Sequence, residues 1–439
     1  MKPMKHLVPL LVSLWLPLVH AEDLMTVYRL ALENDPQLQA AKEQLSSTRE
    51  SKSLAWSQLL PTVGVGGSYN SIRSDVQTEA GVSVDHTTKY HDSSLGLNLT
   101  QPIYRRDRLI KLEQADSSIA AAEAQYAAAE IDLMVRSTSA YFAILSAEDD
   151  LRVAKAEQEA NGRQLEQAQQ RFDVGLIAIT DVHEAQAAYD SARASVISSE
   201  NSLDNAWEAL FEIIGPQAKM PLATLSEELP LSPPAPNNLQ SWSDTAQQEN
   251  YSIIASRAEL KVLEQEIDVS KSGHFPTLDL VGGYNANRSS REGANEANMA
   301  SIGLTLEVPL YAGGAVSATT RQTQANYRAA QQGLDQTRRA VNRQVRDAFR
   351  GVLSTISQVE ALKAATISAQ SALESTQAGY EVGTRTIVDV LNVQRALFSS
   401  QRDYLNSRYG YIINGLSLKS AAGNLSEQDL EQVNGWLEK

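Results

Sequence analysis

The side chains best suited to specific chemistry gather at two copies of one short motif. The first copy spans residues 172–182, and the second lies 208 positions further on, at residues 380–390. The second copy carries a phenol, Tyr380, and a guanidinium, Arg385, where the first copy is apolar. The first copy carries a hydroxyl and a carboxylate at Thr180–Asp181. These complementary groups could link two neighbouring coils by charge-assisted hydrogen bonds.

An ordinary surface is the alternative interpretation of these side chains. Arg385 would then be a solvated arginine and Tyr380 a packing residue, because exposed ion pairs contribute little to stability. The residues alone leave both interpretations open.

Glycines occupy matching positions in the two copies, at Gly175 and Gly383. Each follows a valine where the chain must reverse between helices, and glycine supplies the positive-φ conformation that such a stop needs. Asp181 and Asp389 follow six residues later. A carboxylate in the first turn of a helix interacts favourably with the helix dipole. The motif therefore predicts a helix reversal in each copy.

Catalytic constellations are absent from the sequence. There is no phosphate-binding loop, nucleophile elbow or HExxH motif. His86 and His91 have no metal-ligand spacing and are expected in a solvated polar loop. The chain has no cysteine, which excludes disulfides, thiol catalysis and a lipidated N-terminal cysteine. We expect neither an enzyme nor a bound cofactor or metal.

Two further pairs of segments repeat in the same order as the motif. Residues 61–70 match 276–285, and residues 95–104 match 302–311. Three landmarks at nearly one offset indicate a tandem duplication of about 200 residues, which is longer than a solenoid repeat. The repeated segments also alternate apolar and small or polar residues, with tyrosines at their ends, as in strands that cross an outer membrane. Two hairpins in a soluble sheet remain the alternative. The four expected strands are 59–70, 93–103, 275–285 and 300–310.

Long stretches with almost no helix breaker lie between the strands and the motif. Residues 105–172 and 314–380 carry alanine-rich heptads such as Ile119, Tyr126 and Leu133, which indicate coiled-coil packing. A helix of 68 residues is a rod of roughly 100 Å. Shorter helical segments have about half that length, so two could stack end to end beside each rod. These shorter segments are 22–58, 180–214, 240–273 and 386–422.

The two ends of the chain and its middle have distinct compositions. Lys2 and Lys5 precede an apolar run, Leu7–Val19, and a small-residue cleavage site, which is typical of a signal peptide. Six prolines between the repeats exclude a helix there and predict a linker that wraps the outside of the rods. The expected segments are a signal peptide (1–21), a first repeat (22–214), the proline-rich linker (215–239), a second repeat (240–422) and a C-terminal tail (423–439).

Four transmembrane strands cannot close a barrel, and an open strand edge cannot lie in lipid. The chain should therefore oligomerise. Two copies would give eight strands, filled by side chains, and three would give twelve with room for a lumen. The formal net charge is −15, and −17 without residues 1–21, because 36 basic residues then face 53 acidic ones. Such a surface disfavours nucleic-acid binding.

These residues resemble the TolC family of outer-membrane efflux and secretion ducts over nearly the whole mature chain, most strongly at Arg171–Val182 and Gly379–Leu391. The resemblance implies a mainly α fold with a small β part and a homotrimer. A twelve-stranded β-barrel in the outer membrane lipid of a Gram-negative bacterium would stand on a periplasmic α-barrel, with the linker in an equatorial region. It also implies a passive exit duct that meets a periplasmic adaptor (membrane fusion) protein and an inner-membrane RND, ABC or MFS transporter.

The resemblance also assigns roles to the motif residues. Family members hold the tip closed through residues that match Tyr380 and Arg385, set against those that match Thr180 and Asp181. Two more linking positions are Gln164 and Gln377, although Gln377 replaces an acid there.

Further positions match the family's pore entrance and tip. Asp389 matches an aspartate of the periplasmic constriction, whereas Asn392 replaces a second aspartate one turn further on. The resemblance therefore implies one acidic ring in a trimer. The residues that match the adaptor-contacting tip are Gly175, Leu176, Gly383 and Thr384.

Two other classes of protein remain as alternatives. A periplasmic adaptor would need one coiled-coil hairpin flanked by compact β domains, whereas this chain has two hairpins and four strands. A structural rod that spans the envelope without a lumen would conduct no ions.

Overall fold

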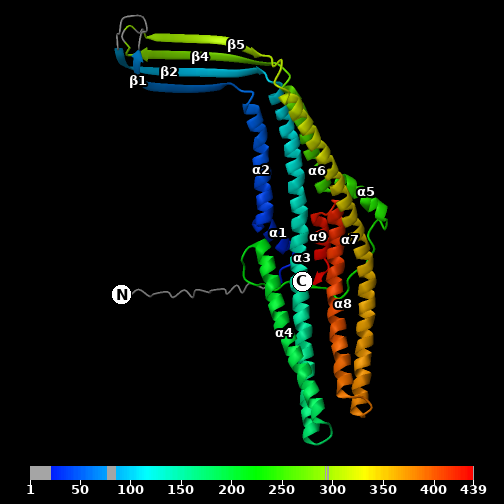
Figure 1. Cartoon of the computed structure of the whole chain (residues 1–439). Coiled ribbons are helices and arrows are strands. Elements are labelled where there is room, and N and C mark those ends of the chain that lie inside the picture. The colour runs from blue at the N-terminus through cyan, green and yellow to red at the C-terminus, as the bar shows by residue number, and fades with distance from the viewer. Residues whose placement is uncertain (1–20, 77–85, 292, 294–295, 439) are drawn as a thin grey trace, which may run out of the picture.

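The computed structural model describes residues 21–76, 86–291, 293 and 296–438, so the predicted signal peptide lies outside it except for Ala21. A β-sheet lies at one end of the molecule, and long helices run away from it side by side (Figure 1). Within the described ranges, no helix combines the length and the apolar character needed to cross a membrane.

The sheet joins the two halves of the chain. Its order is β1-β2-β4-β5, all antiparallel, and β2 pairs with β4 so that Leu97 lies opposite Tyr284. At the end of the sheet far from the helices the strands extend beyond the predicted bounds, and the β1–β2 pairing continues up to His86, whereas β5 ends at Glu307 and not at the predicted 310. His91 stacks on Tyr69 with ring centroids 5.5 Å apart. Both histidines thus belong to a strand and not to the expected loop. The strands are β1 Thr62–Val76, β2 His86–Tyr104, β4 Thr277–Ser289 and β5 Ala297–Glu307.

Two long helices form the rods. They are α3, Arg106–Asp173, with 68 residues, and α7, Ala315–Glu381, with 67. In Figure 1, α2 and α4 lie one after the other along α3, while α6 and α8 do so along α7. The heptad positions Val345 and Val352 are buried in α7, as coiled-coil packing requires. The flanking helices are α2 Pro36–Ser57, α4 Ile179–Ile214, α6 Tyr251–Ser272 and α8 Ile387–Ala422.

Two of the expected half-length helices are each broken into two. Asp35 ends α1, Leu24–Asn34, and caps α2, whose first residue is Pro36. Proline fits the first helical position because no intrahelical partner awaits its missing N–H. Burial opposes ionisation of Asp35, but hydrogen bonds from Arg136 on α3 and from the Leu38 amide, together with the charge of Arg136, outweigh it and lower the pKa of this carboxyl. Asn250 separates α5, Leu239–Glu249, from α6 in a similar way.

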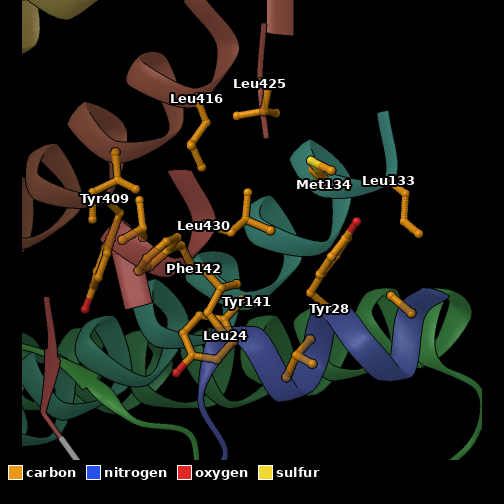
Figure 2. Packing of buried hydrophobic residues seen from close by; sticks show 14 of the residues in the cluster. Leu24, Tyr28, Leu133, Met134, Tyr141, Phe142, Tyr409, Leu416, Leu425 and Leu430 are labelled. Carbon is orange, nitrogen blue, oxygen red and sulfur yellow. The ribbon is translucent and has the colours of Figure 1, made fainter. Parts of the chain in front are cut away.

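The main hydrophobic core includes Leu133 to Leu145, near the middle of α3. Figure 2 shows how its side chains pack. Tyr141 and Phe142 on α3 pack there between Leu24 of α1 and Tyr409 of α8. The linker crosses α8, where the Tyr411 hydroxyl accepts a hydrogen bond from the Ser232 amide at 3.0 Å. The sequence did not predict a short helix and a two-residue strand pair that also lie at this core. They are α9 Glu427–Asn434, and β3 Thr224–Leu225 paired with β6 Leu437–Glu438.

Candidate functional site

The two motif copies form the turns at the ends of the rods, far from the sheet (Figure 1). We call the turn between α3 and α4 the first tip and that between α7 and α8 the second tip. Both glycines have positive φ, 75° at Gly175 and 77° at Gly383, as the sequence predicted. In each tip the residue after the glycine donates its amide N–H to a carbonyl five residues back, at 2.8 Å. The two tips therefore end their long helices with the same Schellman-type turn.

Both tips expose apolar side chains. Leu176 is 73% exposed in the first tip, and Val382 is 76% exposed in the second. Val174 is similarly exposed. Thr384 is exposed, and its hydroxyl donates to the Gly379 carbonyl at 3.0 Å. The tips thus present an apolar surface that the chain itself leaves uncovered.

The helices that follow the tips begin differently. The N-cap residue of α4 is Ala178, whose side chain cannot accept a hydrogen bond from the first turn. At the start of α8, Thr386 and Asp389 form a capping box. The Asp389 carboxylate accepts from the Thr386 amide at 2.9 Å and from its hydroxyl at 3.0 Å, and these bonds lower the pKa of Asp389. Asn392 is exposed one turn further along α8.

Tyr380 connects the second coil, α7 and α8, to the first coil, α3 and α4. The Arg171 guanidinium lies 4.6 Å from the centre of its ring. The ring packs on a small cluster made by Ala188 of α4 with Ile387 and Leu391 of α8. Its hydroxyl is buried and has no hydrogen-bond partner among the described residues. Tyr380 is therefore a packing residue in the single chain, and its hydroxyl remains available to donate a hydrogen bond.

Arg385 lies across the end of α7. A Cβ atom at Gly379 would come within 2.8 Å of its Cγ, so the glycine makes room for this side chain. Among the described residues, no hydrogen bond or ion pair joins Tyr380 or Arg385 to Thr180 or Asp181. Thr180 is exposed and Asp181 half-buried in the first turn of α4.

Among the described residues, neither glutamine at the predicted linking positions forms a hydrogen bond to the other coil. Gln164 is 8% exposed on α3, and its Oε1 has no hydrogen-bond partner within the described part of the chain. Gln377 is half-buried on α7. The single chain thus leaves a buried donor at Tyr380 and a buried acceptor at Gln164 without partners among the described residues.

Sequence analysis missed two features of this region. The first is the Arg171 guanidinium, which stacks on the Tyr380 ring. Arg171 corresponds to Gly379 in the second copy, so comparing the two copies did not indicate a partner for Tyr380 there. Asn161 and Gln394 form a buried amide pair between α3 and α8, with Gln394 Nε2 donating to Asn161 Oδ1 at 2.9 Å. The signal was a polar residue in an alanine heptad, since Asn161 lies seven positions from both Ala154 and Ala168. Across the described ranges, no cluster of side chains could hold a metal ion.

A family model described as outer membrane efflux protein matches residues 27–216 and 242–424, one stretch in each half of the chain. The chain belongs to this family. It is 40% identical to the outer membrane protein TolC of Vibrio cholerae over 443 residues, which cover 99% of each protein. It is 29% identical to the alkaline protease secretion protein AprF of Pseudomonas aeruginosa, covering 93% of this chain and 86% of that protein.

Solved structures of outer membrane efflux proteins have the same fold. The outer membrane channel CmeC of Campylobacter jejuni superposes with a TM-score of 0.80 at 18% identity, covering 95% of this chain and 90% of that one. This outer membrane efflux protein is therefore an exit channel of the Gram-negative outer membrane that extends into the periplasm and serves efflux and type I secretion.

Proposed function

We propose that three copies of the chain assemble into a passive duct in which their sheets close one twelve-stranded barrel. The open sheet carries this proposal: among the described strands, β1 and β5 each have a partner on one side only. An unpaired edge is unstable in hydrocarbon, so β1 of one copy would pair with β5 of the next. Three copies leave a lumen, whereas two would be filled by side chains.

The sheet surface supports a lipid-facing outer side. Val63 and Val65 on β1, and Ile302 and Leu304 on β5, are exposed at alternate positions. Side chains two residues apart point to the same face of a strand. Each edge strand thus offers an apolar row on one face, as lipid contact requires.

The second tip would act as the movable half of a gate. In the closed trimer, Tyr380 and Arg385 would bond to Thr180 and Asp181, and Gln164 and Gln377 would add a second level of contact. The buried, unpartnered Tyr380 hydroxyl and Gln164 carbonyl oxygen support this assignment, because such groups are unfavourable unless something pairs with them. Within one chain, Arg171 already holds the Tyr380 ring against the first coil.

Asp389 would form the entrance ring. Both of its capping bonds end on Oδ2, and Oδ1 accepts none from the described residues, so the carboxylate can serve as a cap and still face a pore. Three such groups around one opening would attract cations, while Asn392 would add a neutral ring. The capping role is the competing explanation for this acid.

The exposed apolar tips fit a docking surface. Gly175, Leu176, Gly383 and Thr384 would meet a periplasmic adaptor protein, which would connect the duct to an inner-membrane transporter of the RND, ABC or MFS class. The cargo would be drugs, small toxic molecules or proteins. The duct would perform no catalysis and carry no cofactor. Copurification with inner-membrane partners would identify the cognate transporter.

The assembly is tested by weighing detergent-solubilised particles with mass photometry and by recording currents in planar bilayers. A trimer that conducts is expected. A stable monomer or dimer would overturn the barrel, and a trimer that conducts nothing would favour a structural rod.

A further inference from the structure

We propose that Asn161 and Gln394 are positioning residues that form the pivot of the gate, the level at which the second coil stays joined to the first while the tips separate. The proposal rests on the gate described above and adds a hinge to it. Asn161 is 5% exposed on α3, and Gln394 is 2% exposed on α8. Between this pair and the tips, the described residues show no other side-chain hydrogen bond that joins α3 to α8.

The pair fastens three helices together. Gln394 donates from Nε2 to Asn161 Oδ1 at 2.9 Å, and Asn161 donates from Nδ2 to the Ala188 carbonyl of α4 at 3.3 Å. Buried amide groups are unfavourable when unpaired, and sliding α8 along α3 would leave Gln394 Nε2 and Asn161 Oδ1 without this bond. A single polar residue at a heptad core position is known to fix the register of coiled helices. The amide pair therefore defines one relative position of the two coils.

The pair is also the last of a series of side-chain bonds between α3 and α8. Further from the tips, the Tyr409 hydroxyl donates to Asp149 at 2.7 Å, and Ser146 donates to Asn406 at 2.6 Å. On the tip side of Gln394, the described residues show no side-chain hydrogen bond between these two helices. Near the tips, α8 meets the first coil through apolar packing of Ile387 and Leu391 on Ala188 of α4, and the buried Tyr380 hydroxyl in this cluster has no partner among the described residues.

The change from apolar packing near the tips to hydrogen bonds at Gln394 determines how far the coils can separate. Apolar packing near the tips can be exchanged for other contacts as the second coil moves. The amide pair is directional and cannot slide without losing its bonds. The coils should therefore part from the tips up to Gln394 and remain joined beyond it.

The first test measures how far the tips separate. Because the chain has no cysteine, spin labels at Val174→Cys and Val382→Cys would report the distance between the exposed tips without background. In the trimer with Tyr380→Phe and Arg385→Ser, adding Gln394→Leu should broaden this distance distribution and shift it outward. Asn406→Leu, which removes the next two bonds between the same helices, to Ser146 and Asp150, should leave the distance at the parent position. Equal effects of the two substitutions, or none from Gln394→Leu, would overturn the pivot.

The second test joins the pair. In the same gate variant, Asn161→Cys and Gln394→Cys are linked by a short bis-thiosulfonate reagent and released by reductant. A pivot stays together during opening, so the linked channel should keep its open conductance. A linked channel that is held shut until reductant is added would make the pair a latch and refute the proposal. Should Gln394→Leu impair folding, Gln394→Asn provides a milder shortening of the same amide.

Failure of the gate and failure of the pivot give different results. If Tyr380→Phe with Arg385→Ser leaves conductance at the parent value, the gate assignment fails. The tip distances in Gln394→Leu against Asn406→Leu, in the chain with a native gate, then still decide whether the amide pair limits coil separation.

Discussion

The two tips have the same backbone and different side chains. Each long helix ends in a glycine with positive φ and an amide bond that reaches back five residues. The helix that follows is uncapped at Ala178 in the first tip and has the Thr386–Asp389 capping box in the second. The turn itself is therefore a structural requirement of a helix reversal, and the positions that differ are the ones free to acquire a function.

Two of the differences add polar groups to the second tip, whereas Arg171 and Thr180 of the first tip correspond to Gly379 and Val388. Tyr380 replaces a phenylalanine and Arg385 an isoleucine, and each adds a hydrogen-bonding group. The first tip contributes the complementary Arg171, whose guanidinium covers the Tyr380 ring. The second tip is thus the side that carries the specific contacts, and the first tip is the surface on which they act.

Removing the polar groups of the second tip should have the largest effect. Tyr380→Phe with Arg385→Ser makes this tip resemble the first while the helices keep their pattern. We expect conductance in planar bilayers to rise several-fold, with the trimer retained. Arg163→Ser is the matched control, because Arg163 is an exposed arginine of the first coil whose one ion pair among the described residues is with Glu159 on the same helix, at 2.6 Å. Equal currents from the double variant and its parent would assign Tyr380 to packing and Arg385 to the solvated surface.

The entrance charge should have the next largest effect. In a trimer, three Asp389 carboxylates would bind a multivalent cation, because low-dielectric walls strengthen their field. Asp389→Ala should abolish most of the block by a trivalent cation added on the periplasmic side, and Asn392→Asp should tighten it. Asp181→Ala changes the equivalent carboxylate of the first tip and serves as the control. If Asp389→Ala is blocked as strongly as the parent, Asp389 serves α8 as a cap alone.

The sequence predicted the architecture well because its signals are long and repeated. The heptads of α3 and α7, the two reversal glycines and the four alternating strands each extend over many residues or occur twice. What it missed depends on single side chains: Asp35–Pro36 and Asn250 break helices whose apolar periodicity continues through them. The β3–β6 pair joins residues more than 200 positions apart through two residues each, which no local pattern reveals.

The site was predictable only in part for a similar reason. Comparing the two copies found Tyr380 and Arg385, since these differ from their counterparts. It did not find Arg171 or the Asn161–Gln394 pair, because their partners come from another element and three-dimensional packing alone brings them together. The links from Tyr380 and Arg385 to Thr180 and Asp181 stay a prediction for the assembled trimer.

Capping should distinguish the tips by a smaller amount. Thr386→Ala removes the cap of α8 and is expected to destabilise its first turn by about 1 kcal/mol, the usual effect of losing an N-cap. Ala178→Ser installs a cap on α4 and should stabilise that turn by a similar amount. Hydrogen exchange of the amides in both first turns measures each change. Identical protection before and after both substitutions would mean that coil packing, not capping, holds these turns.

The cap also has a pH dependence with a definite sign. The folded tip lowers the pKa of Asp389, so the capping contribution is complete above the ordinary aspartate value of about 3.9. It is lost as the pH falls through the lower, folded value. Hydrogen exchange at the start of α8, corrected for intrinsic rates, should therefore speed up below about pH 4 in the parent. The Asp389→Asn variant should lack this acid-dependent step.

The smallest effect should come from the space beside Arg385. Gly379→Ala places a methyl group within 2.8 Å of the Arg385 Cγ and 3.2 Å of the Thr384 hydroxyl, so the arginine must shift. We expect conductance to rise less than two-fold. Gly333→Ala is the control on the same helix, because its Cβ meets nothing within 4 Å and it brings the same gain in helix propensity.

A double-mutant cycle decides whether the effect acts through Arg385. In the Arg385→Ser background, Gly379→Ala should change conductance no further, since the side chain that it displaces is gone. An increase of the same size in both backgrounds would show that the methyl group perturbs the turn itself. Gly379 would then serve the backbone of the turn, as Gly383 does. Arg385 would have no defined position at the second tip on which the closed state depends.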